Sequence, residues 1–80
     1  MIIEIISPEK RIELEDVSMI NLPAFEGKME VLSGHAPAIV ILEKGEMRIK
    51  HKEKIMNFIL FNRGVAHVTP SRTVVLLENF

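Results

Sequence analysis

The sequence lacks cysteine and tryptophan, and its only aromatic residues are four phenylalanines. The absence of cysteine excludes disulfides, thiolate metal sites and cysteine nucleophiles, and it favours a reducing cytosolic compartment. Only four glycines are present and they are widely separated, so the chain has no glycine-rich loop for a nucleotide phosphate. With so few aromatic residues, the core must be filled by Ile, Val, Leu and Met.

Neither sign of charge dominates, and no apolar run is long. Ten basic and eleven acidic residues leave a net charge of −1, which gives no general attraction to nucleic acid or acidic lipid. The apolar start of the chain has no basic leading segment and is broken by Glu4 and Pro8, well short of a signal peptide or a membrane span. We therefore expect any contact with a membrane to be indirect, and any partner to be recognised by shape.

The length of the chain suits one domain, and we expect residues 1–80 to form a single one. Short apolar runs rich in β-branched residues recur between turn signals, and they lack the apolar spacing of a helix. The sequence thus predicts an all-β fold, a compact β-sandwich of about eight to ten short, mostly antiparallel strands. The expected strands are Ile2–Ser7, Arg11–Glu15, Val17–Leu22, Glu26–Leu32, Ala38–Leu42, Met47–His51, Ile55–Phe61, Gly64–Thr69 and Thr73–Leu77.

Turn residues predict where strands stop and how they are joined. Pro23 is expected to stop the third strand, because proline cannot donate to a sheet ladder. The segment Glu43–Glu46 is expected to close a hairpin, with Gly45 at a positive φ. This hairpin would pair Ala38–Leu42 with Met47–His51.

A second turn at Lys52–Lys54 leads into the run Ile55–Phe61, whose nearly continuous apolar character indicates cover on both faces. Along alternating strands, every second residue is expected to face the core. The predicted core residues are Ile3, Ile5, Leu14, Ile39, Ile41, Met47, Ile49, Phe58, Leu60, Val74 and Leu76.

No arrangement of residues predicts catalysis or metal binding. His35, His51 and His67 are far apart, and none has a second histidine at metal-site spacing. Neither Ser33 nor Ser71 lies in a nucleophile elbow, and so small a sandwich leaves little room for a ligand cavity. We therefore expect no catalytic residue, no metal and no cofactor. A small hydrolase that uses Ser33 and His35 is the enzyme alternative.

A basic stripe offers another function. Arg48, Lys50, Lys52 and Lys54 recur with a period of two, which would place them on one face of a hairpin. Such a face is either solvated and protects strand edges, or binds an acidic ligand. Nucleic-acid surfaces normally interleave aromatic residues, and this stripe has none, so we expect no nucleic-acid partner. A free-standing β-module that binds an acidic ligand or nucleic acid stays the alternative.

Several motifs resemble those of the epsilon subunit of F-type ATP synthases. The segment Gly34-His35-Ala36-Pro37 matches the family's Gly-His-Ala-Pro loop, the segment 44–49 resembles its Pro-Gly-x-hydrophobic-Arg-Ile hairpin, and the segment 62–65 its Ser-Gly-Gly-hydrophobic step. The resemblance covers essentially the whole chain and implies the N-terminal β-sandwich domain of that subunit. Family members commonly continue into a two-helix hairpin that restrains ATP hydrolysis and in some members binds ATP. The sequence stops at Phe80, so neither property is expected here.

The resemblance implies a non-catalytic subunit of the central stalk, within the rotor, that couples the gamma subunit to the proton-carrying ring of c subunits for ATP synthesis. Such a subunit would lie at the cytoplasmic face of the bacterial inner membrane, as a peripheral part of the complex. Removed from its partners, it is expected to expose a contiguous apolar patch. The residues expected to contact the gamma subunit and the ring are Glu26, Gly27, Lys28, Met29, Glu30, Ser33, Gly34, His35, Ala36 and Pro37.

Overall fold

The computed structural model describes residues 1–80 and consists of nine strands without a helix. All nine predicted strands are present, each within two residues of its expected ends, which confirms the all-β prediction. No element could cross a bilayer as a long apolar helix. The strands are β1 (Ile2–Ile6), β2 (Arg11–Leu14), β3 (Val17–Ala24), β4 (Gly27–Val31), β5 (Ala38–Leu42), β6 (Gly45–His51), β7 (Lys54–Leu60), β8 (Gly64–Val68) and β9 (Arg72–Leu77).

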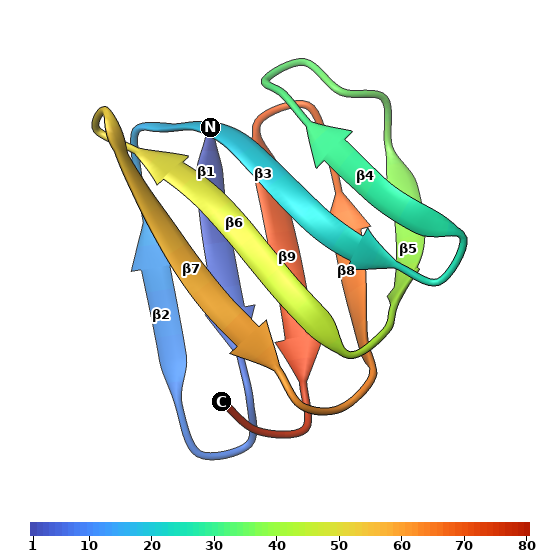
Figure 1. The fold of residues 1–80 in the computed structure, drawn as a ribbon. Helices are drawn as coiled ribbons and strands as arrows, with labels where there is room; N and C mark the ends of the chain where they lie inside the picture. The colour runs from blue at the N-terminus through green and yellow to red at the C-terminus, as the bar shows by residue number, and fades with distance from the viewer.

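The strands form one curled sheet that folds into two layers (Figure 1). Its order is β2-β1-β9-β8-β5-β3-β6-β7, and β4 pairs with β3 outside this path. One layer contains β2, β1, β9, β8 and β5, and the other contains β7, β6, β3 and β4 (Figure 1). All pairs are antiparallel except β1 with β9, which brings the first and last strands together in parallel.

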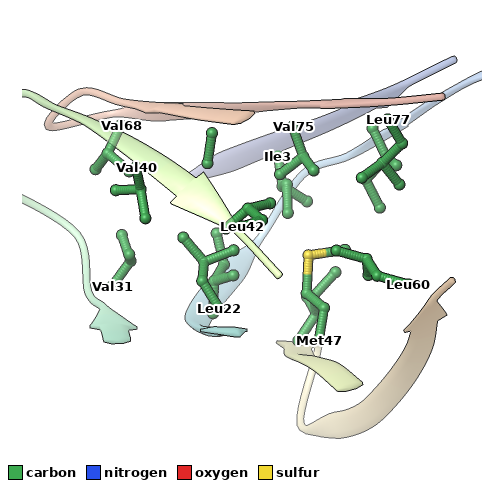
Figure 2. Packing of buried hydrophobic residues seen from close by; sticks show 14 of the residues in the cluster. Ile3, Leu22, Val31, Val40, Leu42, Met47, Leu60, Val68, Val75 and Leu77 are labelled. Atoms are coloured by element: carbon green, nitrogen blue, oxygen red, sulfur yellow. The ribbon is translucent and has the colours of Figure 1, made fainter. Parts of the chain in front are cut away.

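The core lies between the two layers, where alternate residues of each strand point inward. Ile3 and Ile5 of β1 are fully buried, as are Met47 and Ile49 of β6 in the opposite layer. Figure 2 shows Val75 and other residues of one layer packed toward Met47 and its neighbours in the other. The buried cluster consists entirely of aliphatic residues and methionine, as the scarcity of aromatic residues predicted.

The predicted facing of β5 and β9 is wrong. Ile39, Ile41 and Leu76 are 66%, 50% and 48% exposed, and Val74 is only half-buried on the same outer side. These strands are apolar at consecutive positions, so alternation could not tell the inner face from the outer one. The predicted core residues Leu14 and Phe58 are half-buried and pack against the core. The residues of β5 and β9 that face inward are Val40, Leu42, Val75 and Leu77.

The predicted hairpin between β5 and β6 is also wrong. β5 pairs with β8 and touches the end of β3, whereas β6 pairs with β3 and β7. The short connection between β5 and β6 instead carries the chain from one layer to the other. Gly45 has the expected positive φ of 153°, and a Cβ there would lie 3.1 Å from Cβ of Pro23.

Pro23 does not stop β3, contrary to expectation. It lies inside the strand and is buried. Its carbonyl accepts a hydrogen bond from the amide of Glu43, so its backbone faces away from β4. On the side of β3 that faces β6, the pairing of the two strands ends at Asn21 with Arg48. No strand there needs a backbone N–H from residue 23, so proline is tolerated.

The apolar run of β7 is covered on one face only. Met56 and Phe58 lie opposite the buried Ile49 and Met47 and face inward. Ile55 and Ile59 face outward and are 44% and 53% exposed. The expectation of cover on both faces is therefore wrong, because the fold has only two layers and no element packs over the outer side of β7.

Candidate partner-binding surface

The predicted contact residues lie along β4 and at both of its ends. Glu26 lies in the turn from β3, the residues from Gly27 to Glu30 lie in β4 itself, and the segment 33–37 forms the loop from β4 to β5. Four residue steps along β4 separate its ends by about 14 Å. The structure thus brings the predicted residues onto one strand and its flanks, but not into a single cluster.

The loop between β4 and β5 is anchored to the turn between β8 and β9. The amide of Gly34 donates to the carbonyl of Pro70 at 2.8 Å, and the amide of His35 donates to the carbonyl of Leu32 at 3.1 Å. Gly34 has a φ of 86°, which other residues adopt only under strain. The half-buried ring of His35 lies with Nδ1 2.7 Å from the carbonyl oxygen of Ala36. The loop therefore has a defined shape.

At the other end of β4, the turn borders an open groove of about 470 Å³. Gly27 has a φ of 126°, and Phe25 beside it is 63% exposed. Ile39 and Ile41 of β5 line the opposite side of the groove. A partner that fills this groove would meet apolar side chains.

A contiguous apolar surface covers the outside of β5, β8 and β9. Cross-strand pairing places Ile41, Val65 and Leu76 in one row and Ile39, His67 and Val74 in the next. We call this surface, formed by Ile39, Ile41, Val65, Val74 and Leu76, the outer apolar face. It provides the apolar patch that was expected, and four of its five residues, all except Val65, had been predicted to lie in the core.

A cluster of ion pairs covers the outside of β1, β2 and β9, next to the outer apolar face. Glu4 accepts from Nε of Arg11 at 2.8 Å and also pairs with Arg72, and both arginines contact Glu13. The hydrogen bond from Arg11 is the main reason that the pKa of Glu4 lies below its ordinary value. The two carboxylates and the two guanidinium groups are all paired with one another. A partner that approaches this side of the layer would therefore meet no unpaired charge from these four residues. The sequence analysis had missed this cluster.

The histidines and the basic stripe do not form a ligand site. No group of three acidic or histidine side chains lies close enough to hold a metal ion. Arg48 and Lys50 share the outer side of β6. Lys52 lies in the turn that follows, and Lys54 pairs with His51 and belongs to the alternate set of β7 residues that face inward. The four basic residues therefore do not share one face, contrary to expectation.

Comparison of sequences finds close relatives along the whole chain. The family described as "ATP synthase, Delta/Epsilon chain, beta-sandwich domain" matches residues 1–80. The ATP synthase epsilon chain of Granulibacter bethesdensis is 41% identical over 76 residues, covering 95% of this chain and 56% of that relative. The ATP synthase epsilon chain of Allorhizobium ampelinum is 35% identical over 77 residues, with the same two coverages. The chain spans little more than half the length of the curated relatives it matches.

Comparison of structures finds the same fold. A chain in the cryo-EM structure of the Tetrahymena thermophila mitochondrial ATP synthase central stalk and c-ring has a TM-score of 0.83 and 13% identity, covering 99% of this chain and 63% of that one. A chain in the Euglena gracilis mitochondrial OSCP/F1/c-ring structure has a TM-score of 0.86 and 21% identity, covering 96% of this chain and 49% of that one. At these identities the similarity shows the fold alone.

Proposed function

The chain belongs to the β-sandwich domain family of the ATP synthase delta/epsilon chain, and from that membership we propose that it is a non-catalytic subunit of the rotor stalk. Residues 1–80 act as one unit that couples the gamma subunit to the ring of c subunits. In this role the chain lies at the cytoplasmic face of a bacterial inner membrane and reaches the membrane only through the ring.

The observation that carries the proposal is the outer apolar face. Its three most exposed side chains, Ile39, Ile41 and Leu76, leave about half or more of their surface in water. Fully burying one such side chain contributes about 1.5–3 kcal/mol, and contiguous apolar surfaces on soluble proteins mark interaction sites. A rotor subunit has large partners on several sides, which would cover this face.

The loop and turn that flank β4 supply the second contact region of the proposal. Gly34 and His35 are fixed by backbone hydrogen bonds, so the loop presents one shape to a partner. Lys28 and Glu30 are exposed and both lie on the outer side of β4. Exposed ion pairs contribute only about 0–1 kcal/mol each, so shape would dominate recognition here.

The mechanical role follows from packing. Torque must pass from one rotor part to another without slip, and a close-packed interior deforms little. The two layers enclose a continuous buried cluster that joins residues from both. A rigid body of this kind transmits force, and no chemistry on the chain itself is required.

The proposal is tested by purifying the tagged chain from membrane-retaining extracts of its own cells and identifying what accompanies it. We expect the gamma and c subunits of ATP synthase to co-purify with the parent chain. Ile41→Lys places a charge in the outer apolar face and should remove them. The matched control is Ile59→Lys, since Ile59 is equally exposed, at 53% against 50%, but lies in the other layer. Absence of ATP synthase subunits from the parent purification would refute the proposal.

A further inference from the structure

β7 is an open edge of the sheet. It ends the strand order and pairs only with β6. The turn before it closes on the pair of His51 with Lys54, as a two-residue hairpin does. Hydrogen-bonded pairs then fall on every second residue, so the amides and carbonyls of Met56 and Phe58 face β6.

The intervening residues direct their backbone groups away from β6. The neighbouring ladder agrees with this alternation, because the amide of Lys52 donates to Asp16 and the carbonyl of Lys50 accepts from Ser18, both on the β3 side. In β7 the amides and carbonyls of Ile55, Asn57 and Ile59 therefore point to the open edge. These groups are ready to pair with another strand.

The side chains of β7 do not protect this edge. Apart from Lys54 at its start, β7 carries no charge, and it has no proline or glycine; these are the devices that usually block strand addition. The other edge strands differ: β2 carries Arg11 and Glu13, and β4 carries Lys28 and Glu30. β7 is thus the least protected edge of the fold.

The open edge is also symmetric about Asn57. Reading outward from it in either direction, the next residue with free backbone groups is an isoleucine, Ile55 on one side and Ile59 on the other. We propose that the unassembled chain pairs with a second copy of itself through β7, antiparallel, with a two-fold axis at Asn57. Each of these three residues then donates and accepts one hydrogen bond across the interface.

The side chains support this register. Ile55 of one copy lies opposite Ile59 of the second copy, so both exposed isoleucines gain an apolar neighbour on the outer face. On the inner face, the half-buried Met56 of one copy lies opposite the half-buried Phe58 of the other. These pairs extend the core across the axis. Asn57 meets Asn57 of the second copy, and no like charges lie directly opposite.

Amide hydrogen exchange, followed by NMR over a dilution series, tests the pairing. The series extends up to about 1 mM, because an interface formed by a single pair of strands is small and such interfaces are weak. On association, the amides of Ile55, Asn57 and Ile59 should become protected by at least tenfold. The amides of Met56 and Phe58 should be protected at every concentration, because they bond to β6. Sedimentation equilibrium in parallel should report a dimer. Exchange at residues 55, 57 and 59 that does not change with concentration would overturn the proposal.

Variants at the axis decide whether β7 is the interface. Asn57→Pro removes an amide that β6 does not use and should abolish the dimer, whereas Asn57→Val should retain it. If the proline variant fails to fold, Asn57→Lys decides, since it places two cations opposite each other and should weaken association at least tenfold. Asn79→Lys is the matched control, on an exposed asparagine outside the strands, and should associate like the parent. Unchanged association of Asn57→Lys would mean that another surface forms the dimer.

Discussion

The turn between β6 and β7 stores strain that a single substitution should release. Its two central residues, Lys52 and Glu53, have φ values of 49° and 69°. Positive φ at both positions defines the type I′ turn, which fits the twist of a hairpin but favours Asn and Gly. Neither residue present is one of these. We predict that Glu53→Gly stabilises the fold.

The magnitude follows from two opposing contributions. A side chain in left-handed geometry costs about 1–2 kcal/mol, and glycine at Glu53 would remove that cost. Glycine also loses more conformational freedom on folding, by about 0.5–1 kcal/mol. The difference is a gain of about 0.5–1 kcal/mol in the free energy of unfolding. For a chain of this length, this raises the midpoint of thermal unfolding by about 2–8 °C.

Thermal unfolding by circular dichroism and a urea titration at low protein concentration would measure the gain. The urea midpoint should rise without a change in slope, because the surface exposed on unfolding stays the same. The matched control is Glu46→Gly, at an exposed glutamate within β6. Glycine there should lower the stability by about 0.5–1 kcal/mol. If both variants lost stability equally, residue 53 would not have left-handed geometry, and the reasoning would fail.

Three further predictions concern other parts of the chain. Gly64→Ala should cost about 1–3 kcal/mol in urea unfolding, because its Cβ would lie 2.7 Å from the carbonyl oxygen of Leu76; a neutral result would show that β8 can move away from β9. The pKa of Glu4 is lowered in the folded state, so its contribution to stability is fully present above the ordinary carboxyl pKa of 4.5 and is lost as pH falls through the folded value. In unfolding experiments between neutral pH and pH 3, Glu4→Gln should flatten that part of the profile, and an unchanged profile would refute the role of the ion pairs. Gly34→Val should reduce co-purification with ATP synthase subunits more than Lys28→Ala does, because it distorts the loop; equal recovery would show that the loop is only a connector.

The positions of the strands could be read from the sequence because turn residues punctuate the chain. The turn before β7 was identified correctly, since it joins neighbours in one layer. The pairing of β5 was not, because a short connection with a glycine predicts a hairpin whether or not the chain changes layers. Only the packing of the two layers decides this. The prediction that Ile39 and Ile41 face the core was wrong because both faces of β5 are apolar, so the sequence does not distinguish the inner face from the outer one.

The candidate site was predictable only where its residues are consecutive. The loop that contains Gly34 and His35 could be identified by its short motif, and the structure gives it a fixed shape. The ion-pair cluster could not be identified, since Arg72 and Glu4 are 68 residues apart and meet only through the pairing of β1 with β9. Nothing in the local pattern around either residue indicates that neighbour.

The parallel pairing of β1 with β9 determines when this fold can be completed during synthesis. Of the nine strands, β1 is synthesised first, yet its inner neighbour in the sheet, β9, is synthesised after all the others. Until then, Ile3 and Ile5 have only the short β2 beside them, and the other edge of β1 has no partner strand. Contacts of such long range close late and slowly, typically in milliseconds to seconds for β-rich domains. One side of β1 therefore stays unpaired until β9 has been synthesised, and a chaperone that shields β1 would act over that interval.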